Sequence, residues 1–405
     1  MFKTIKNIFN YYQCNKNYKK KLEELCSKEG KIKVCFLIRE NQKWSYQSLY
    51  ELLVKSEEFE PVVLVSLLWL SHIGKDTTRK NLEENYNFFK EKGMNVQFAY
   101  ENGQYVDLSK FNPDIIFYDQ PWDLPEIHKP ETVSQFALTC YAPYGFGILN
   151  VKSDYTKEFH KLLFKYFVNN ELMLKTFKNK ASNCIVTGNP KYDVYLEKEN
   201  NKETLWKNNN AIKIIYAPHH SLDKKGLKLA TFKENGKFIL EYARNHKETT
   251  WIFKPHPRFK YALLRNNVMT LEEIEKYYKA WNEVGHICEG GDYFKYFKTS
   301  DLLITDCCSF LGEYFPTSKP IIRLSTETKP PFNEIGKLID NYSYTAKTNE
   351  ELKSHLTNLI SKNFDNKKSL RENAVPKILN LTNKSSEKIY YYLKKATKVK
   401  GNKND

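Results

Sequence analysis

The sequence lacks any hydrophobic run long enough to cross a membrane. A transmembrane helix requires roughly 18 consecutive apolar residues, and the best apolar run, Pro61 to Leu70, is only strand-sized. Glycine and proline number 15 each in 405 residues, which excludes collagen-like and wholly disordered chains. Hydrophobic residues make up 41% and aromatic residues 15%, enough to build real cores. At about 100–200 residues per domain, we expect a soluble globular protein of two domains.

The motifs of several enzyme classes are missing as well. The chain has neither G-x-G-x-x-G nor a G-x-x-x-x-G-K-[ST] phosphate loop. H-E-x-x-H and G-x-S-x-G are absent, which removes support for zincins and α/β-hydrolases. No Asp-x-Asp pair and no C-x-x-C pair occurs, so nothing in the sequence calls for a metal ion or another cofactor. The eight cysteines are therefore expected to be buried free thiols in a reducing compartment.

Arginine is rare: the 64 basic residues include seven arginines, against 48 acidic residues and a net charge of +16. Residues 1–33 and 390–405 carry ten of these net charges, mostly as lysine. Proteins that read nucleic-acid sequence favour arginine for guanine edges and phosphates, so no nucleic-acid partner is expected. Lysine-rich ends suit an anionic membrane surface or a polyanionic substrate. A lysine-rich composition without meaning for binding is the open alternative.

The N-terminus has no apolar core followed by a small-residue cleavage site, so no secretory signal is expected. Apolar residues recur there at helical spacing, with lysines between them: Phe2, Ile5, Ile8, Phe9 and Tyr12. This pattern fits a short interfacial helix on a membrane. It fits equally well a helix that packs on the protein's own surface.

The body alternates strand-like and helix-like segments in two series. Strands alternating with helices of ten to fifteen residues indicate βαβ units and parallel sheets. The predicted fold is therefore α/β, with two doubly wound Rossmann-like domains and a final helix, near 387–395, placed to cross back to the first domain. The predicted strands are 31–38, 61–68, 95–100, 114–119 and 136–141 in the first series, and 183–188, 213–218, 251–255, 301–306 and 320–324 in the second. The domain boundaries that follow are a basic helical segment over 1–30, domains over 31–180 and 181–370, and a helix with a basic tail over 371–405.

Doubly wound folds bind their ligands at the carboxyl ends of the strands. Four segments of the second series follow predicted strands: 187–193, 216–221, 253–259 and 305–314. We expect them to bring polar and cationic side chains to one rim. The candidate binding residues from the second and third segments are Pro218, His219, His220, Lys254, His256 and Arg258.

The segment 305–314, TDCCSFLGEY, predicts an anion site. Asp306 is a good N-cap, and the helix that follows would expose the backbone N–H groups of Cys307, Cys308 and Ser309. Glu313, one turn later, is placed to accept from a ribose hydroxyl. The plain alternative is that Asp306 only caps the helix and that Glu313 is solvated.

The segment FKPHP places Lys254 and His256 two residues apart, so both are expected on the same side of a strand end. They would bind phosphate together, with His256 also donating to a leaving group. Alone, this pair is better explained as an exposed lysine and a turn histidine, and it is the four such segments together that favour a binding site.

Two loops of the first series carry the candidates for the acceptor side. CYAPYGFG contributes Tyr144 and Gly145, and DQPWDLP contributes Asp119, Trp122 and Asp123. A carboxylate or Tyr144 would take a proton from an acceptor hydroxyl. Taken singly, each residue is more typical of an ordinary turn with a buried Tyr and Trp.

The ordered motifs G-N-P-K-x-D, YAP, K-x-HP and TD-x-x-S with a later acidic residue resemble the CDP-glycerol glycerophosphotransferase family. This resemblance implies a GT-B fold, in which two Rossmann-like domains face a cleft and the second binds most of the donor. It also implies a cytoplasmic protein attached peripherally to the inner face of the bacterial cell membrane.

Carried over to this chain, the resemblance assigns His256 to the donor pyrophosphate and Glu313 to the acidic position. It assigns Asp306 and Ser309 to a phosphate-binding helix start. The glycine-proline turn that would open the second domain corresponds to Gly188, Pro190 and Asp193. Family members carry a His-Gly pair in the first domain, where this chain has Tyr144-Gly145, so the general base is left open.

The expected activity is transfer of glycerol phosphate or a similar polyol phosphate from a CDP-linked donor, with release of CMP. The acceptor is a hydroxyl of a glycan or a lipid-linked polymer of the teichoic-acid or capsule type. The expected catalytic residues are His256, Tyr144 and Asp119. The first alternative is a GT-B glycosyltransferase with a nucleotide-sugar donor, for capsule or lipopolysaccharide synthesis. A non-enzymatic polyanion binder is the second, and it predicts steep salt dependence of binding.

Overall fold

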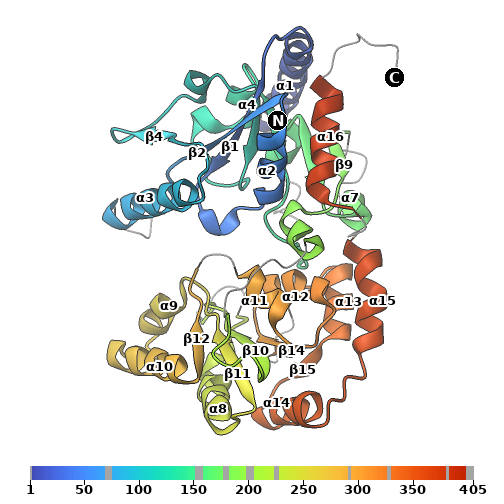
Figure 1. Cartoon of the computed structure of the whole chain (residues 1–405). Helices are drawn as coiled ribbons and strands as arrows, with labels where there is room; N and C mark the ends of the chain where they lie inside the picture. The colour runs from blue at the N-terminus through green and yellow to red at the C-terminus, as the bar shows by residue number, and fades with distance from the viewer. Residues whose placement is uncertain are drawn as a thin grey trace. The chain divides into compact units, whose positions relative to one another are not determined.

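A computed structural model describes residues 2–68, 75–150, 158–176, 182–197, 205–222, 228–290, 293–325, 330–379 and 383–397. The chain forms two compact units (Figure 1). The first contains residues 1–145, 151–196 and 379–405, and the second contains 146–150 and 197–378. Among the described helices, none is long and apolar enough to span a bilayer. The basic residues after Thr397 lie outside the described part of the chain.

The first unit is built on a seven-stranded sheet whose strands all pair in parallel. In spatial order the strands are β3 (Val96–Phe98), β2 (Phe59–Val65), β1 (Ile32–Ile38), β6 (Ile115–Tyr118), β7 (Leu138–Tyr141), β8 (Lys165–Val168) and β9 (Cys184–Val186). Because both faces are covered, the central strands read as continuous apolar runs. Alternate residues of β1 enter separate cores: Val34 and Phe36 join one, Cys35 and Leu37 the other. A small antiparallel pair, β4 (Tyr100–Glu101) and β5 (Gln104–Tyr105), stands apart from the sheet.

The helices of the first unit come from both ends of the chain. The final helix packs against α2, and its Ile389 and Leu393 enter the same core as Phe36 (Figure 1). The prediction that this helix crosses back to the first domain is confirmed. The helices are α1 (Phe2–Cys26), α2 (Gln47–Lys55), α3 (Lys75–Glu91), α4 (Pro130–Val133), α6 (Glu158–Leu162), α7 (Glu171–Thr176) and α16 (Ser385–Thr397), with short 3-10 turns η1 (Asn41–Lys43), η2 (Leu108–Phe111), η3 (Glu126–His128) and η4 (Pro190–Leu196).

The N-terminal helix is part of this unit rather than an appendage. Tyr18 of α1 is buried, and its hydroxyl lies 2.5 Å from Thr139 Oγ1 and donates to Leu162 O at 2.7 Å. Cys14 and Leu25 are buried in the same core. The other half of α1 is different, because Ile5, Ile8, Phe9 and Tyr12 are all exposed.

The assignment of the strand over 183–188 to the second series was wrong. β9 pairs with β8, in the register Tyr166↔Cys184, and closes the edge of the first sheet. Asp193, which follows it, accepts hydrogen bonds from the backbone N–H groups of Ser385 and Ser386 at 2.7 and 2.8 Å. The glycine-proline turn therefore anchors the first turn of α16. Asp193 and Ser385 are 192 residues apart in the chain, so no local sequence pattern indicates this contact.

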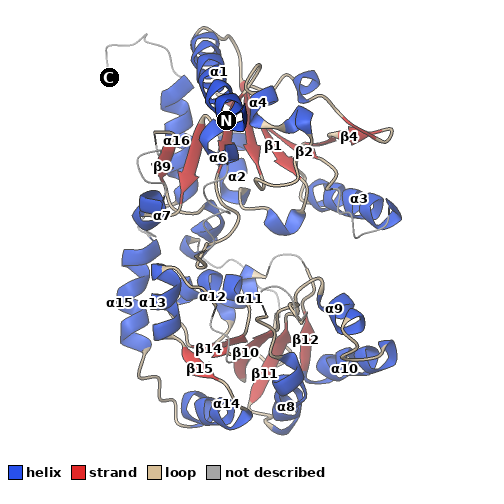
Figure 2. Cartoon of the chain, turned by 180° about the vertical axis from the view of Figure 1, so that it is seen from behind, coloured by secondary structure: helices blue, strands red, loops and turns tan. Residues whose placement is uncertain are grey.

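The second unit is built on a six-stranded parallel sheet, with its helices packed around it (Figure 2). In spatial order the strands are β12 (Gly285–Ile287), β11 (Thr249–Phe253), β10 (Ile212–Ala217), β13 (Leu302–Thr305), β14 (Ile321–Leu324) and β15 (Tyr344–Ala346). The helices are α8 (Phe232–Asn245), α9 (Phe259–Arg265), α10 (Leu271–Val284), α11 (Phe294–Thr299), α12 (Cys308–Tyr314), α13 (Glu334–Tyr342), α14 (Asn349–Leu356) and α15 (Lys368–Leu379), with the 3-10 turn η5 (Phe315–Thr317) and the π turn η6 (Thr357–Ser361). The prediction of two parallel α/β domains is confirmed.

A short segment from the middle of the chain, residues 146–150, packs on α12 and α13 within the second unit. Asn333 N donates to Ile148 O at 2.9 Å, and Asn150 N donates to Pro331 O at 2.6 Å. Leu149 forms an isolated antiparallel bridge with Phe332. Glycines on the two helices allow this close approach, since a Cβ at Gly336 would overlap the carbonyl oxygen of Ile148.

We therefore expect Gly336→Ala to destabilise the protein. Alanine is favoured over glycine inside a helix by about 1 kcal/mol, but the added methyl meets fixed backbone, and such overpacking costs about 1–3 kcal/mol. Urea unfolding followed by circular dichroism measures the difference. Gly290→Ala is the control, because no atom lies within 4 Å of its Cβ position. Equal stability of the two variants would contradict the close packing of residues 146–150.

Candidate functional site

The strand-end edge of the second unit brings three of the four predicted segments together. β10 lies between β11 and β13, in the registers Tyr216↔Phe253 and Ala217↔Thr305. The segments that follow these strands, 216–221, 253–259 and 305–314, therefore emerge side by side. The fourth segment, 187–193, belongs to the first unit.

Three histidines form the centre of this edge. The ring centroids of His220 and His256 lie 3.8 Å apart with the rings stacked, and His219 lies 4.4 Å from His220 and 5.6 Å from His256. The backbone fixes the arrangement, because His256 N donates to the carbonyl of the buried Pro218 at 3.2 Å. Among the described residues, no group of three or more His, Cys, Asp or Glu side chains is placed to hold a metal ion.

The local hydrogen bonds set the tautomers of two of these rings. Arg258 N donates to His256 Nδ1 at 3.1 Å, and Ser221 N donates to His219 Nδ1 at 3.2 Å. A nitrogen that accepts carries no proton, so each neutral ring holds its proton on Nε2. Burial lowers the pKa of His219 to about 3, helped by His220. Burial and then the neighbouring His220 and His219 lower the pKa of His256 to about 2. Both rings are therefore neutral hydrogen-bond donors at pH 7.

The prediction that Asp306 caps the following helix was wrong. Cys307 is the N-cap residue of α12, and no side chain caps that end. The Asp306 carboxylate is buried and accepts from His219 N at 2.6 Å, from Thr231 N at 2.7 Å and from Thr231 Oγ1 at 3.0 Å. Asp306 therefore ties the backbone of the histidine loop to the residue that precedes α8. Burial raises its pKa to about 6, partly offset by these hydrogen bonds.

The start of α12 offers fewer N–H groups to an anion than the sequence predicts. Cys307 N already donates to Thr305 Oγ1 at 3.0 Å. Burial raises the pKa of the Cys307 and Cys308 thiols to about 12, so neither is a thiolate. Ser309 is exposed. Its hydroxyl remains a predicted phosphate ligand.

Lys254 and Glu313 form a second cluster, through a residue that the sequence did not single out. Lys254 is 4% exposed, and its Nζ lies 5.1 Å from the ring centroid of Tyr293 and 5.7 Å from that of Phe310. The Tyr293 hydroxyl donates to Glu313 Oε2, and Glu313 is itself buried rather than solvated. The aromatic faces stabilise the buried ammonium. Arg258, by contrast, is exposed at the start of α9.

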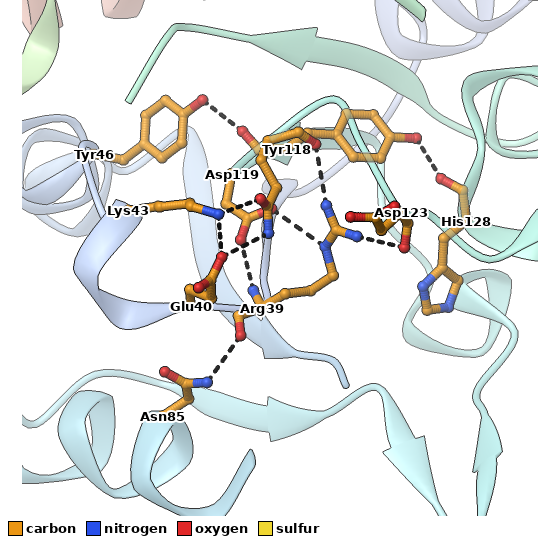
Figure 3. Close-up of polar contacts among 10 residues, drawn as sticks. Arg39, Glu40, Lys43, Tyr46, Asn85, Tyr118, Asp119, Asp123 and His128 are labelled. Carbon is orange, nitrogen blue, oxygen red and sulfur yellow. Dashed lines mark hydrogen bonds and ion pairs between the residues drawn. The ribbon is translucent and has the colours of Figure 1, made fainter. Parts of the chain in front are cut away.

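The strand-end edge of the first unit carries a buried ion pair. Arg39 and Asp119 follow β1 and β6 and are each 1% exposed. Asp119 Oδ2 accepts from Arg39 N at 2.8 Å, and its Oδ1 lies 3.5 Å from Arg39 Nε (Figure 3). Burial raises the pKa of Asp119, with Arg39 acting in the opposite direction. Asp119 thereby fixes the end of β1, and its role in proton transfer stays a prediction.

Tyr144 and Trp122, predicted for the acceptor side, meet in this unit around a lysine. Their rings are 6.1 Å apart and perpendicular. Lys43 Nζ lies 5.4 Å from the Tyr144 centroid and 5.9 Å from that of Trp122. Asn169 Nδ2 donates to the carbonyl of Gly145 at 3.4 Å, which holds the adjoining loop. Lys43 lies in the polar turn η1 and belongs to no recognisable motif, so it could not be selected from the sequence.

Two parallel α/β units, each with polar groups at its strand ends, define a GT-B type protein, and comparison with solved structures agrees. The wall teichoic acid polymerase TagF matches in two variants, with TM-scores of 0.63 and 0.62 at 13% and 15% identity. The alignments cover 98% of this chain and 96% and 97% of the TagF chains. The UDP-GlcNAc 2-epimerase of Neisseria meningitidis, bound to UDP-GlcNAc, matches with a TM-score of 0.56 at 13% identity, over 90% of this chain and 100% of the other.

Residues 157–395 match the CDP-Glycerol:Poly(glycerophosphate) glycerophosphotransferase family. The match spans more than half of the chain, which therefore belongs to this family and is a transferase of the glycerophosphotransferase type. No curated protein sequence matches.

The raised pKa of Asp306 predicts a pH-dependent stability. Its pKa is 3.8 in an unfolded chain and about 6 in the fold, so its contribution is complete below pH 3.8 and is lost as pH rises through 6. We expect the unfolding free energy of the wild type, relative to Asp306→Asn, to fall by roughly 1–3 kcal/mol between pH 4 and 7. Urea titrations at each pH measure it.

The matched control for this titration is Asp301→Asn, at an exposed carboxylate that accepts from Lys213 N at 2.8 Å. If the difference in unfolding free energy between the wild type and Asp306→Asn stays constant from pH 4 to 7, the raised pKa of Asp306 is contradicted.

Proposed function

We propose that the protein transfers glycerol phosphate, or a similar polyol phosphate, from a CDP-linked donor to a hydroxyl of a teichoic-acid or capsule-type polymer. The observation that carries this proposal is the strand-end edge of the second unit. It combines the neutral Nε2–H donors of His219 and His256 with the buried cation of Lys254, in a chain of this family. Such an edge suits the pyrophosphate of a nucleotide donor.

In the proposed reaction the acceptor oxygen forms a bond to the phosphorus nearest glycerol. The bond from that phosphorus to the bridging oxygen breaks, and its electron pair leaves with CMP. His256 donates its Nε2–H to a pyrophosphate oxygen. With its pKa lowered to about 2, the free ring has no second proton to give at pH 7, so it acts as a hydrogen-bond donor and not as an acid. The charge that develops on the leaving group is balanced by Lys254 and by the exposed Arg258.

The ribose of the donor is assigned to Glu313. A carboxylate accepts hydrogen bonds from vicinal hydroxyls, and the Tyr293 hydroxyl already fixes its orientation. His220 stacks on His256 and would maintain the position of that ring. The exposed Ser309 hydroxyl is placed to meet a phosphate oxygen.

The alternative is a glycosyltransferase of the same fold. It is kept because Tyr144-Gly145 stands where the family carries a His-Gly pair. The two reactions differ in their products: phosphate transfer from a CDP-polyol releases CMP, whereas sugar transfer from a UDP-sugar releases UDP.

The test is the nucleotide released from CDP-glycerol, CDP-ribitol and a panel of UDP- and CMP-sugars, with a poly(glycerol phosphate) acceptor present. We expect CMP from a CDP-polyol, and a loss of about 10²–10³-fold in kcat for His256→Ala, because one donor to the developing charge is removed. The control is His246→Ala, in the same unit, whose ring stacks on Tyr242. UDP from a UDP-sugar, or equal rates for the two variants, would overturn the assignment.

We also propose that α1 holds the protein at the inner face of the cell membrane. The described apolar side chains of its first half are exposed: Ile5, Ile8, Phe9 and Tyr12 at 59%, 53%, 64% and 70%. The same helix carries a lysine-rich stretch, and such a helix binds anionic lipid through apolar burial and charge together.

Substituting Ile8 and Phe9 by serine should therefore weaken co-sedimentation with phosphatidylglycerol vesicles at least tenfold, since each loses the burial of a large apolar side chain. The substitutions leave the buried Tyr18 in place, so the fold is retained. Tyr261→Ser, at a side chain of 55% exposure in α9, is the control. Unchanged sedimentation of the double variant would show that this face does not bind the membrane.

A further inference from the structure

A polar cluster at the end of β1 has not been assigned to any step. Its members are Glu40, Lys43 and Gln120, and the side chains of Glu40 and Lys43 are 24% and 19% exposed. Lys43 donates to Glu40 Oε2 and to Gln120 Oε1, and Gln120 Nε2 donates to the same Glu40 Oε2 at 3.3 Å (Figure 3). Both donors reach one carboxylate oxygen. Among the described residues, Glu40 Oε1 receives no hydrogen bond.

The backbone on both sides of Glu40 is held by buried side chains. Arg39 N donates to Asp119, and Asn85 Nδ2 donates to Arg39 O at 2.9 Å. On the other side Asn41 N donates to Asn85 Oδ1 at 2.7 Å. A partly exposed carboxylate is thus fixed in place by hydrogen bonds to its own neighbours in the chain. Such support is typical of a site whose geometry matters for binding or reaction.

The Arg39 side chain adds a second layer below this turn. Its Nη1 donates to Asp123 O at 2.7 Å, and its Nη2 donates to Gln120 O at 3.3 Å. The guanidinium therefore joins the loop after β6 to the end of β1, and it fixes Gln120, which is fully buried. Burying polar groups costs folding free energy unless they are hydrogen-bonded. We therefore infer that the network beneath Glu40 and Lys43 serves to position these two side chains.

Two of the other ionisable groups at this edge are buried, while Asp123 is exposed and its backbone carbonyl accepts from Arg39. Asp119 is buried against Arg39. His128 is fully buried, with Nε2 2.8 Å from Val106 O, and burial lowers its pKa to about 4. Glu40 is partly exposed, and hydrogen bonds from Lys43 and Gln120 hold its carboxylate in place.

Two aromatic rings complete the cluster, since Trp122 and Tyr144 flank Lys43 at right angles to each other. Aromatic faces bind the C–H surfaces of sugars and polyols, while planar carboxylate and amide groups bind their hydroxyls. We propose that Glu40, Lys43, Gln120, Trp122 and Tyr144 form the binding site for a hydroxyl-bearing sugar or polyol of the acceptor, with Glu40 as the group that takes the hydroxyl proton.

This assignment rests on the proposed function and deepens it. The acceptor O–H bond breaks, its proton passes to Glu40 Oε1, and the oxygen bonds to the donor phosphorus as CMP leaves with the electron pair of the broken bond. Glu40 then returns the proton to water. Lys43 orients the carboxylate, and the phenol of Tyr144 takes a binding role in place of the histidine that the family carries.

The first test compares Glu40→Gln with Glu60→Gln, a control on β2 whose carboxylate pairs with Lys33 at 3.7 Å. CMP release from CDP-glycerol is followed with poly(glycerol phosphate) as acceptor, and CDP affinity is measured by calorimetry. Glu40→Gln should lower kcat by about 10²-fold or more, the usual contribution of a general base, with CDP affinity within twofold of the wild type. A kcat within threefold of that of Glu60→Gln overturns the role of Glu40.

The second test needs no turnover. Calorimetric binding of poly(glycerol phosphate) to the full chain should weaken at least tenfold in Trp122→Leu. The control is Tyr261→Ser, at an exposed site, in which binding should stay unchanged. Equal binding by Trp122→Leu and the control, or no binding by the wild type, overturns the acceptor site.

The two proposals fail in different ways. If the wild type uses a nucleotide sugar instead of a CDP-polyol, the proposed phosphate transfer is wrong. The Glu40→Gln comparison is then made on that sugar transfer, because an acceptor hydroxyl must lose its proton in either reaction.

Discussion

Buried aspartates in this protein accept hydrogen bonds from backbone N–H groups that the sheets do not satisfy, in the loops after β1 and β10 and at the starts of α8 and α16. Asp119 accepts from Arg39 N, Asp306 from His219 N and Thr231 N, and Asp193 from Ser385 N and Ser386 N. An unpaired buried N–H group costs about 1–3 kcal/mol. Asp119 and Asp306 thus fix loops that carry the candidate chemistry, and Asp193 fixes the start of α16.

The same burial sets the electrostatics of the second unit. Desolvation keeps His219 and His256 neutral, while the ammonium of Lys254 is retained beside two aromatic rings. The edge therefore offers directed N–H donors together with cationic charge. A site of this kind is suited to a pyrophosphate, whose oxygens accept hydrogen bonds and whose charge is offset by lysine and arginine.

Much of the fold could be predicted from the sequence, because apolar runs and helical periods are local properties. The strands at 31–38 and 213–218 and the final helix were recognised in this way, and β1, β10 and α16 confirm them. Part of the candidate site could be predicted as well, since His256 directly follows a strand. Tyr293 could not, because its relation to Glu313 depends on contacts across the fold and leaves no local pattern.

The sequence by itself determined the α/β class, the family motifs and the residues that follow each strand, since these depend on neighbours along the chain. Only the tertiary structure decided that β9 closes the first sheet and that Asp306 binds a loop instead of capping a helix. It also decided that Arg39 and Asn85 hold the turn on which Glu40 lies. The physical reason is that strand pairing and buried polar contacts join residues far apart in the chain, and their identity is fixed only when the core packs.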